Sequence, residues 1–238
     1  MGLAGWAVFA GLLAGCGGPA AVEQPAADQG NAGSVTDVAA PAVASGPCGA
    51  VIASLGGAAP AAGNVDLVRE ALEGTFPRAP LAEARAAVPQ VRTIASPADY
   101  VQSSGALLDP AARMRALEEA GLRRGVDVEY PLAQGEVSVT VLQLKSSAAA
   151  TRYRDVHLAD ACAISGLMQR IPGVASGVSF FRGTVQDPMT RAVFVVGDSE
   201  VALTVCGCTG ARDPRALVEA WASQIVDASS GNRQARPA

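Results

Sequence analysis

The stretch VDVEYPLAQGEVSVTV, residues 126–141, decides how the rest of this chain can fold. Val126, Val128 and Tyr130 alternate with acidic residues, and valines alternate with serine and threonine from Val137 to Val141. Alternation with a period of two is typical of strands that bury one face. Gln134-Gly135 supplies the residues of a turn between the two runs. The stretch therefore predicts an antiparallel hairpin.

Helices are predicted on both sides of this hairpin. Asp109-Pro110 is typical of a helix start, because an aspartate cap precedes a proline at the first helical position. This helix is expected to reach about Arg124, with Gly125 ending it. A second helix is predicted over about residues 147–165, with an inner face formed by Tyr153, Val156, Cys162 and Ala163. Shorter helices are expected upstream, from Asn64 or Asp66 through Glu73 and from Ser96-Pro97.

The C-terminal third predicts three more strands and a helix. Apolar runs at 178–185, 192–196 and 201–206 are separated by turn residues, including Gly197-Asp198. Asp213-Pro214 then repeats the helix-start pattern. The apolar residues that follow recur at helical spacing and form the clearest amphipathic pattern of the chain, namely Leu217, Val218, Trp221, Ala222 and Ile225.

The predicted order of elements is α-β-β-α-β-β-β-α. Strands joined by turns favour a two-layer α+β fold, with a mainly antiparallel sheet and helices packed on one face. A parallel, doubly wound sheet does not fit this order. The chain has 238 residues, 4% aromatic, with a net charge of -4. We expect one domain over residues 64–228, with a small-residue core and a disordered tail at 229–238.

The first 15 residues are predicted to be a signal peptide. The apolar run of roughly a dozen residues would span only about 18 Å as a helix, well short of the ~30 Å hydrocarbon core. It ends in Leu13-Ala14-Gly15-Cys16, which resembles the lipobox of bacterial prolipoproteins. The resemblance implies cleavage before Cys16 and a lipid on its sulfur. The leader contains no Lys or Arg, unlike a usual leader, which leaves the true start codon open.

Residues 16–63 are predicted to be the lipidated cysteine and a flexible tether, because Ala, Gly and Pro dominate their composition. Cys48 precedes a short apolar run, and if this segment is tied to the body the free tether ends near Gly46. The body resembles uncharacterised lipoproteins of actinobacteria through Arg123-Arg124-Gly125-Val126, the valine-rich hairpin and the cysteine-bearing helix. That resemblance carries over no functional residue.

Four cysteines remain once Cys16 is lipidated. Two disulfides are expected, since disulfides persist outside the cytoplasm. Cys162 is expected to pair with Cys206 or Cys208, which would join the helix to the last strand and leave the other for Cys48. A bridge between Cys206 and Cys208 is the least expected pairing, because the ring it closes is small. The alternative is that Cys206-Gly207-Cys208 forms a redox pair.

Other motifs with a defined chemistry are missing from the sequence. It contains no G-x-S-x-G, no G-x-G-x-x-G and no phosphate loop. The one histidine, His157, has Arg154 and Asp160 as helical neighbours, which predicts a place on the solvated face. We therefore expect no metal and no cofactor.

Four arginines form a candidate anion patch, namely Arg113, Arg115, Arg123 and Arg124. Such a patch would bind an acidic envelope polymer or a lipid headgroup, although alternating charges are more typical of a solvated helix face.

These observations favour a lipid-anchored protein on the extracytoplasmic face of the cell membrane, acting as a non-enzymatic binding or accessory module. Its expected partners are the membrane, through the lipid, and an envelope protein, glycan or lipid ligand. Nucleic acid is not expected, because no basic stripe is present to replace counterions. Two alternatives stay open, an envelope thiol-disulfide redox protein that uses Cys206 and Cys208, and a lipid or glycolipid carrier with its ligand between sheet and helices.

Overall fold

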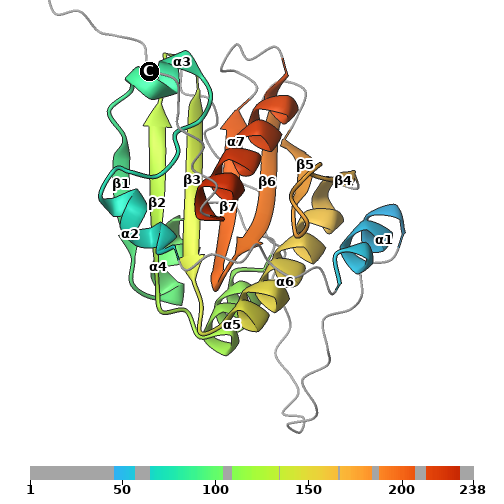
Figure 1. Cartoon of the computed structure of the whole chain (residues 1–238). Coiled ribbons are helices and arrows are strands. Elements are labelled where there is room, and N and C mark those ends of the chain that lie inside the picture. Colours follow the sequence, from blue (N-terminus) through green and yellow to red (C-terminus); the bar gives the residue numbers. More distant parts are fainter. Residues whose placement is uncertain are drawn as a thin grey trace, which may run out of the picture. The chain divides into compact units, whose positions relative to one another are not determined.

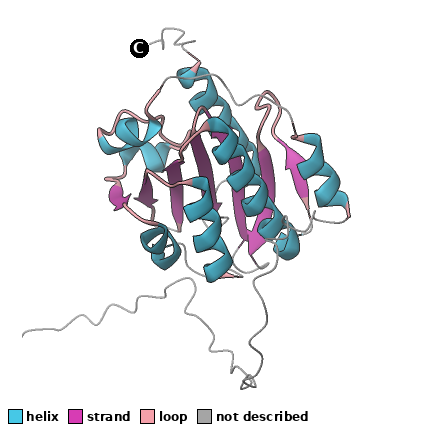
Figure 2. Cartoon of the chain, turned by 90° about the horizontal axis from the view of Figure 1, so that it is seen from below, coloured by secondary structure: helices cyan, strands magenta, loops and turns pink. Residues whose placement is uncertain are grey.

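The computed structural model describes residues 46–56, 65–103, 109–133, 135–165, 167–183, 188–206 and 213–230. All of them belong to one compact unit, Val38–Ala238. The predicted leader and lipobox, Cys208 and the tail beyond residue 230 lie outside the described residues. Figure 1 labels the helices and strands, and Figure 2 shows the strands gathered in the middle with helices packed around them.

Seven strands form one sheet in the order β1-β2-β3-β7-β6-β5-β4, and every neighbouring pair is antiparallel (Figure 1). The strands are β1 (Gln90–Ile94), β2 (Arg124–Pro131), β3 (Glu136–Gln143), β4 (Met168–Arg170), β5 (Val178–Gly183), β6 (Pro188–Val196) and β7 (Ser199–Cys206). The α+β class and the antiparallel sheet are confirmed. β2 and β3 form the predicted hairpin, in which Val128 pairs with Val139.

The helices are α1 (Pro47–Ser54), α2 (Leu67–Leu72), α3 (Ala82–Ala86), α4 (Pro97–Ser103), α5 (Pro110–Ala120), α6 (Ser147–Ser165) and α7 (Pro214–Ser229). Aspartate caps begin three of them, as predicted. The carboxylates of Asp66, Asp109 and Asp213 accept hydrogen bonds from backbone N–H groups in the first turns of α2, α5 and α7. These bonds satisfy N–H groups that have no partner within the helix.

The end of α5 differs from the prediction. The helix ends at Gly121, which has a φ of 63° in the left-handed region that glycine adopts most easily. Gly125, predicted to end the helix, lies within β2 instead. A Cβ atom at Gly125 would lie 2.7 Å from Cδ2 of Leu142 and 2.9 Å from the carbonyl oxygen of Val141. Glycine is required there by the close approach of β3.

Helices cover both faces of the sheet, so the predicted two-layer arrangement is corrected to three layers. α2, α3 and α7 pack on the face that carries Val139, Phe194 and Leu203. α1, α4, α5 and α6 pack on the opposite face, which carries Leu142 and Val195. The hairpin alternates, but the consecutive residues of β6 from Ala192 to Val196 are all buried. A continuous apolar run is typical of a strand covered on both faces.

Two strands were not predicted. β1 is an edge strand whose first four residues, Gln90 to Thr93, are exposed, so it lacks an apolar pattern. β4 has only three residues and forms the other edge of the sheet. Their pairing with β2 and β5 fixes them, and such pairing is a tertiary property that neighbouring residues do not reveal.

The folded body begins before the predicted boundary at Asn64. Cys48 and Leu55, at α1, are buried against Leu158 of α6 and against residues of β4 and β5. α1 therefore belongs to the body, as in the alternative in which the free tether ends near Gly46.

Candidate functional site

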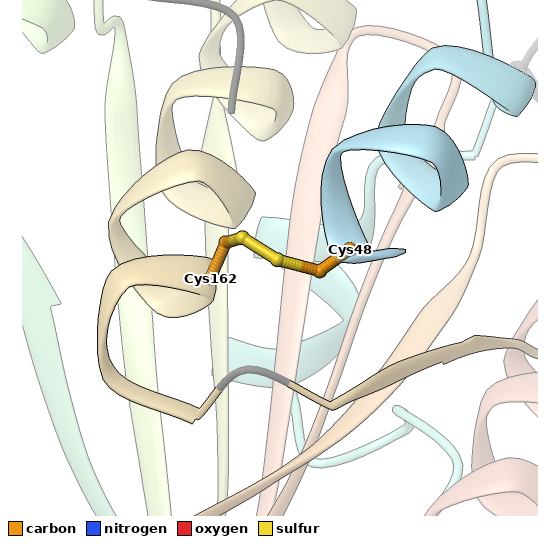
Figure 3. Close-up of a disulfide and its surroundings, with 2 residues drawn as sticks. All are labelled: Cys48 and Cys162. Carbon is orange, nitrogen blue, oxygen red and sulfur yellow. A yellow bond between two sulfur atoms is a disulfide. The ribbon is translucent and has the colours of Figure 1, made fainter. Parts of the chain in front are cut away.

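Two of the predicted cysteines form a disulfide that joins α1 to α6. Cys48 and Cys162 are bonded, with their Cα atoms 6.0 Å apart (Figure 3). The prediction that Cys162 pairs with Cys206 or Cys208 is wrong, because α1 packs on α6 and brings Cys48 to it. Cys206 is disulfide-bonded as well.

The four arginines of the candidate anion patch have different surroundings. Arg123 forms an ion pair with Asp198 at 3.7 Å, and Arg124 forms one with Asp66. Arg113 is buried and is treated below. Arg115 alone of the four makes no hydrogen bond or ion pair within the described part of the chain. Carboxylates already occupy three of the four guanidinium groups, so this geometry does not favour a shared anion site.

A buried polar cluster lies between α5, α6 and β7. Nδ1 of His157 is 2.5 Å from Oε1 of Glu200, and the two residues are only 4% and 2% exposed. Arg113, which is 2% exposed, donates a hydrogen bond to Asp160 at 2.7 Å and reaches the hydroxyl of Tyr153 at 3.5 Å. Burial lowers the pKa of His157, while the Glu200 carboxylate opposes that shift.

Two predictions about α6 are corrected by this cluster. His157 does not lie on the solvated face, and Ala163, predicted to be inner, is exposed. Arg154, one of the polar neighbours that suggested a solvated face, is itself fully buried. Its guanidinium donates to the backbone oxygen of Ser176 and to Asp155. The inner face of α6 is therefore partly charged, and apolar periodicity alone places it wrongly.

We interpret the cluster as part of the core and not as a reaction centre. Its groups are enclosed by packed side chains, and the ions are paired, which is how buried charges are ordinarily tolerated. In the sequence, only the strand alternation of β7 indicates where Glu200 lies, namely on the face opposite to Val201 and Leu203.

A pocket lies on the other side of the molecule, beside the edge strand β1. It has a volume of about 200 Å³ between α2 and strands β1 and β2. Its walls are mainly apolar and are formed by Ala71, Leu72, Phe76, Pro89, Val91 and Val128. Of these, Leu72 and Val91 are exposed, as is Val88, which comes directly before Pro89 in the chain. No pattern in the sequence indicated this pocket, because β1 was not predicted.

Two polar side chains that line the pocket are Tyr130 and Arg78. Tyr130 is 3% exposed, and its ring packs edge-on against Trp221. Burial raises the pKa of Tyr130, and the nearby charge of Arg78 opposes that rise. Arg78 donates one hydrogen bond, at 2.7 Å, to the backbone oxygen of Arg85. Within the described residues the hydroxyl of Tyr130 has no hydrogen-bond partner and Arg78 has no carboxylate partner.

A third polar side chain that lines the pocket, Glu73, carries a negative charge. Its carboxylate is 3.9 Å from the guanidinium of Arg69, and both side chains are more than half exposed. Water and Arg69 therefore screen its charge.

Among the described helices, none is long and apolar enough to cross a membrane. The described ranges also bring together no group of three or more side chains able to hold a metal ion.

Comparison with known proteins gives one structural likeness. No protein family and no curated protein matches the sequence. The extracellular domain of PknH from Mycobacterium tuberculosis is similar in structure, with a TM-score of 0.40 and 11% identity. The match covers 67% of this chain and 89% of that one. At this level the likeness carries no argument about function.

Proposed function

We propose that this chain is a lipid-anchored protein of the extracytoplasmic face of the cell membrane, whose folded body is a non-enzymatic binding or accessory module. The observation that carries the location is the Cys48–Cys162 disulfide. Structural disulfides form and persist in oxidising compartments and are rare in the cytoplasm. The anchor is inferred from Leu13-Ala14-Gly15-Cys16, where a lipid on Cys16 would hold the body at the membrane.

The pocket beside β1 favours a small ligand over a lipid at this place. Pockets for drug-sized ligands measure about 300 to 1,000 Å³. The pocket beside β1, at about 200 Å³, is below that range and is too small for a lipid with two acyl chains. A small ligand, or one group of a larger partner, matches it better.

The redox alternative rests on Cys206, which is disulfide-bonded. An intact-mass thiol count followed by titration with glutathione distinguishes this redox protein from the binding module. Bridges that resist glutathione indicate scaffold cysteines and support the binding module. If Cys206 exchanges reversibly near the potential of the glutathione couple, the proposed function changes from a binding module to a redox protein.

The anchor is tested by labelling a bacterial host with palmitate and comparing the full chain with its Cys16→Ser variant. We expect the wild type to carry the label in the membrane fraction and the variant to carry none, because the thiol is the attachment atom. Gly17→Ser is the matched control and is expected to be labelled. A wild-type chain without label would refute the anchor. Protease accessibility on intact spheroplasts tests the location, and a protected body would refute it.

A further inference from the structure

The pocket beside β1 combines an apolar interior with hydrogen-bond donors that are not used up by the residues the structure describes. Tyr130 is 3% exposed as a residue and lines the pocket, and its hydroxyl makes no hydrogen bond to another described residue. Arg78 is half-buried and carries a positive charge that no described carboxylate neutralises. A guanidinium has five N–H donors, of which the backbone oxygen of Arg85 uses one. Both groups are therefore available to an acceptor that enters the pocket.

The size of the pocket limits the ligand. An apolar cavity of about 150 Å³ holds a benzene molecule, so about 200 Å³ accommodates a ring of that size with one small substituent. The apolar walls favour a hydrocarbon body. The planar fork of a guanidinium matches a carboxylate in geometry as well as in charge.

We propose that this pocket binds a compact apolar monocarboxylate, with its hydrocarbon body against the apolar walls and its carboxylate on the Arg78 guanidinium and the Tyr130 hydroxyl. The ligand can be a free aryl or branched aliphatic acid or the C-terminal residue of a peptide, which present the same chemistry. This inference names the ligand of the proposed binding module and rests on that role, but it does not depend on the lipid anchor.

The first test is equilibrium dialysis of the purified full-length chain against labelled phenylacetate and against phenylacetamide, its neutral isostere. We expect one phenylacetate per chain and at least about tenfold weaker binding of the amide, because the amide lacks the charge that Arg78 pairs with. Equal binding of the two probes, or binding of neither, would overturn the proposal. A loss of binding with palmitate labelling intact would overturn the ligand class alone and leave the anchor standing.

Variants locate the binding to this pocket. Tyr130→Phe keeps the ring against Trp221 and removes only the hydroxyl, and Arg78→Gln removes the charge. We expect each to weaken phenylacetate binding by about tenfold or more, whereas Arg115→Gln, which changes an exposed arginine that does not line the pocket, should bind like the wild type. Arg78→Lys keeps a charge without the fork, and it replaces Arg78→Gln as the test if that variant fails to fold. Unchanged affinity in Tyr130→Phe and in the folded Arg78 variant would overturn the assignment.

The two sources of the carboxylate are separated by a third probe. N-acetyl-phenylalanine presents the same ring and carboxylate on a peptide-like backbone. Tighter binding of this probe than of phenylacetate supports the C-terminal residue of a peptide as the source, and weaker binding supports a free acid. Absence of binding by both acids would overturn the proposal itself.

Discussion

Removal of the Cys48–Cys162 disulfide is expected to lower the free energy of unfolding of the whole body. The bridge closes a loop with a sequence separation of 114, which spans β1, β2 and β3. In the chain-entropy model a loop of this length restricts the unfolded chain by about 5 kcal/mol. Residual structure in the unfolded chain reduces that value, so we expect Cys48→Ala/Cys162→Ala to cost about 3 to 5 kcal/mol.

Urea unfolding measures this change. Trp221 is buried on the face opposite to α1, so its fluorescence reports global unfolding and not the detachment of α1 alone. Far-UV circular dichroism should give the same midpoint if the transition is two-state. Ala50→Ser, an exposed position on α1, is the control and is expected to change the free energy by less than about 0.5 kcal/mol. A loss below about 1 kcal/mol in the double cysteine variant would refute the loop-entropy reasoning.

Three further predictions concern the core. Glu200→Ala should cost about 1 to 3 kcal/mol, because it leaves the buried imidazole of His157 without its hydrogen-bond partner. The double variant His157→Leu/Glu200→Met should cost much less, and equal costs in chemical denaturation would contradict the pairing. Burial lowers the pKa of His157 below its ordinary 6.5. The contribution of His157 to the stability of the folded state is therefore complete above about pH 6.5 and is lost as the pH falls. A pH series of melting temperatures should show this loss, and His157→Gln should reduce it. Gly125→Ala should lower the free energy of unfolding by about 1 to 3 kcal/mol, since the added Cβ would contact the backbone of β3. Ala133→Ser, in the exposed turn, is the control. An unchanged free energy of unfolding in Gly125→Ala would show that β3 moves freely.

The hairpin and the long helices could be predicted because their information is local. The alternation of residues 126–141 gives β2 and β3, and α6 covers the predicted residues 147–165. Asp66, Asp109 and Asp213 cap their helices through bonds to residues two or three positions away. Each of these signals depends on neighbours in sequence, which is why the sequence suffices.

The candidate site could not be predicted in this way. Tyr130 was recognised only as an inward residue of a strand, and its hydroxyl acquires a function only beside Arg78, which reaches the pocket from the loop between α2 and α3. β1, whose Val91 forms part of the wall, lacks an apolar pattern of its own because it is an exposed edge. The pocket is a product of segments that meet only after folding.

The sequence by itself determined the α+β class, the antiparallel pairing of the hairpin and the starts of the main helices, because periodicity and capping are properties of adjacent residues. Only the tertiary structure decided that helices cover both faces of the sheet and that Cys48 pairs with Cys162. It also placed His157 inside, against Glu200. These features depend on which surfaces pack against each other, and the free energy of such packing is shared by residues far apart in the chain.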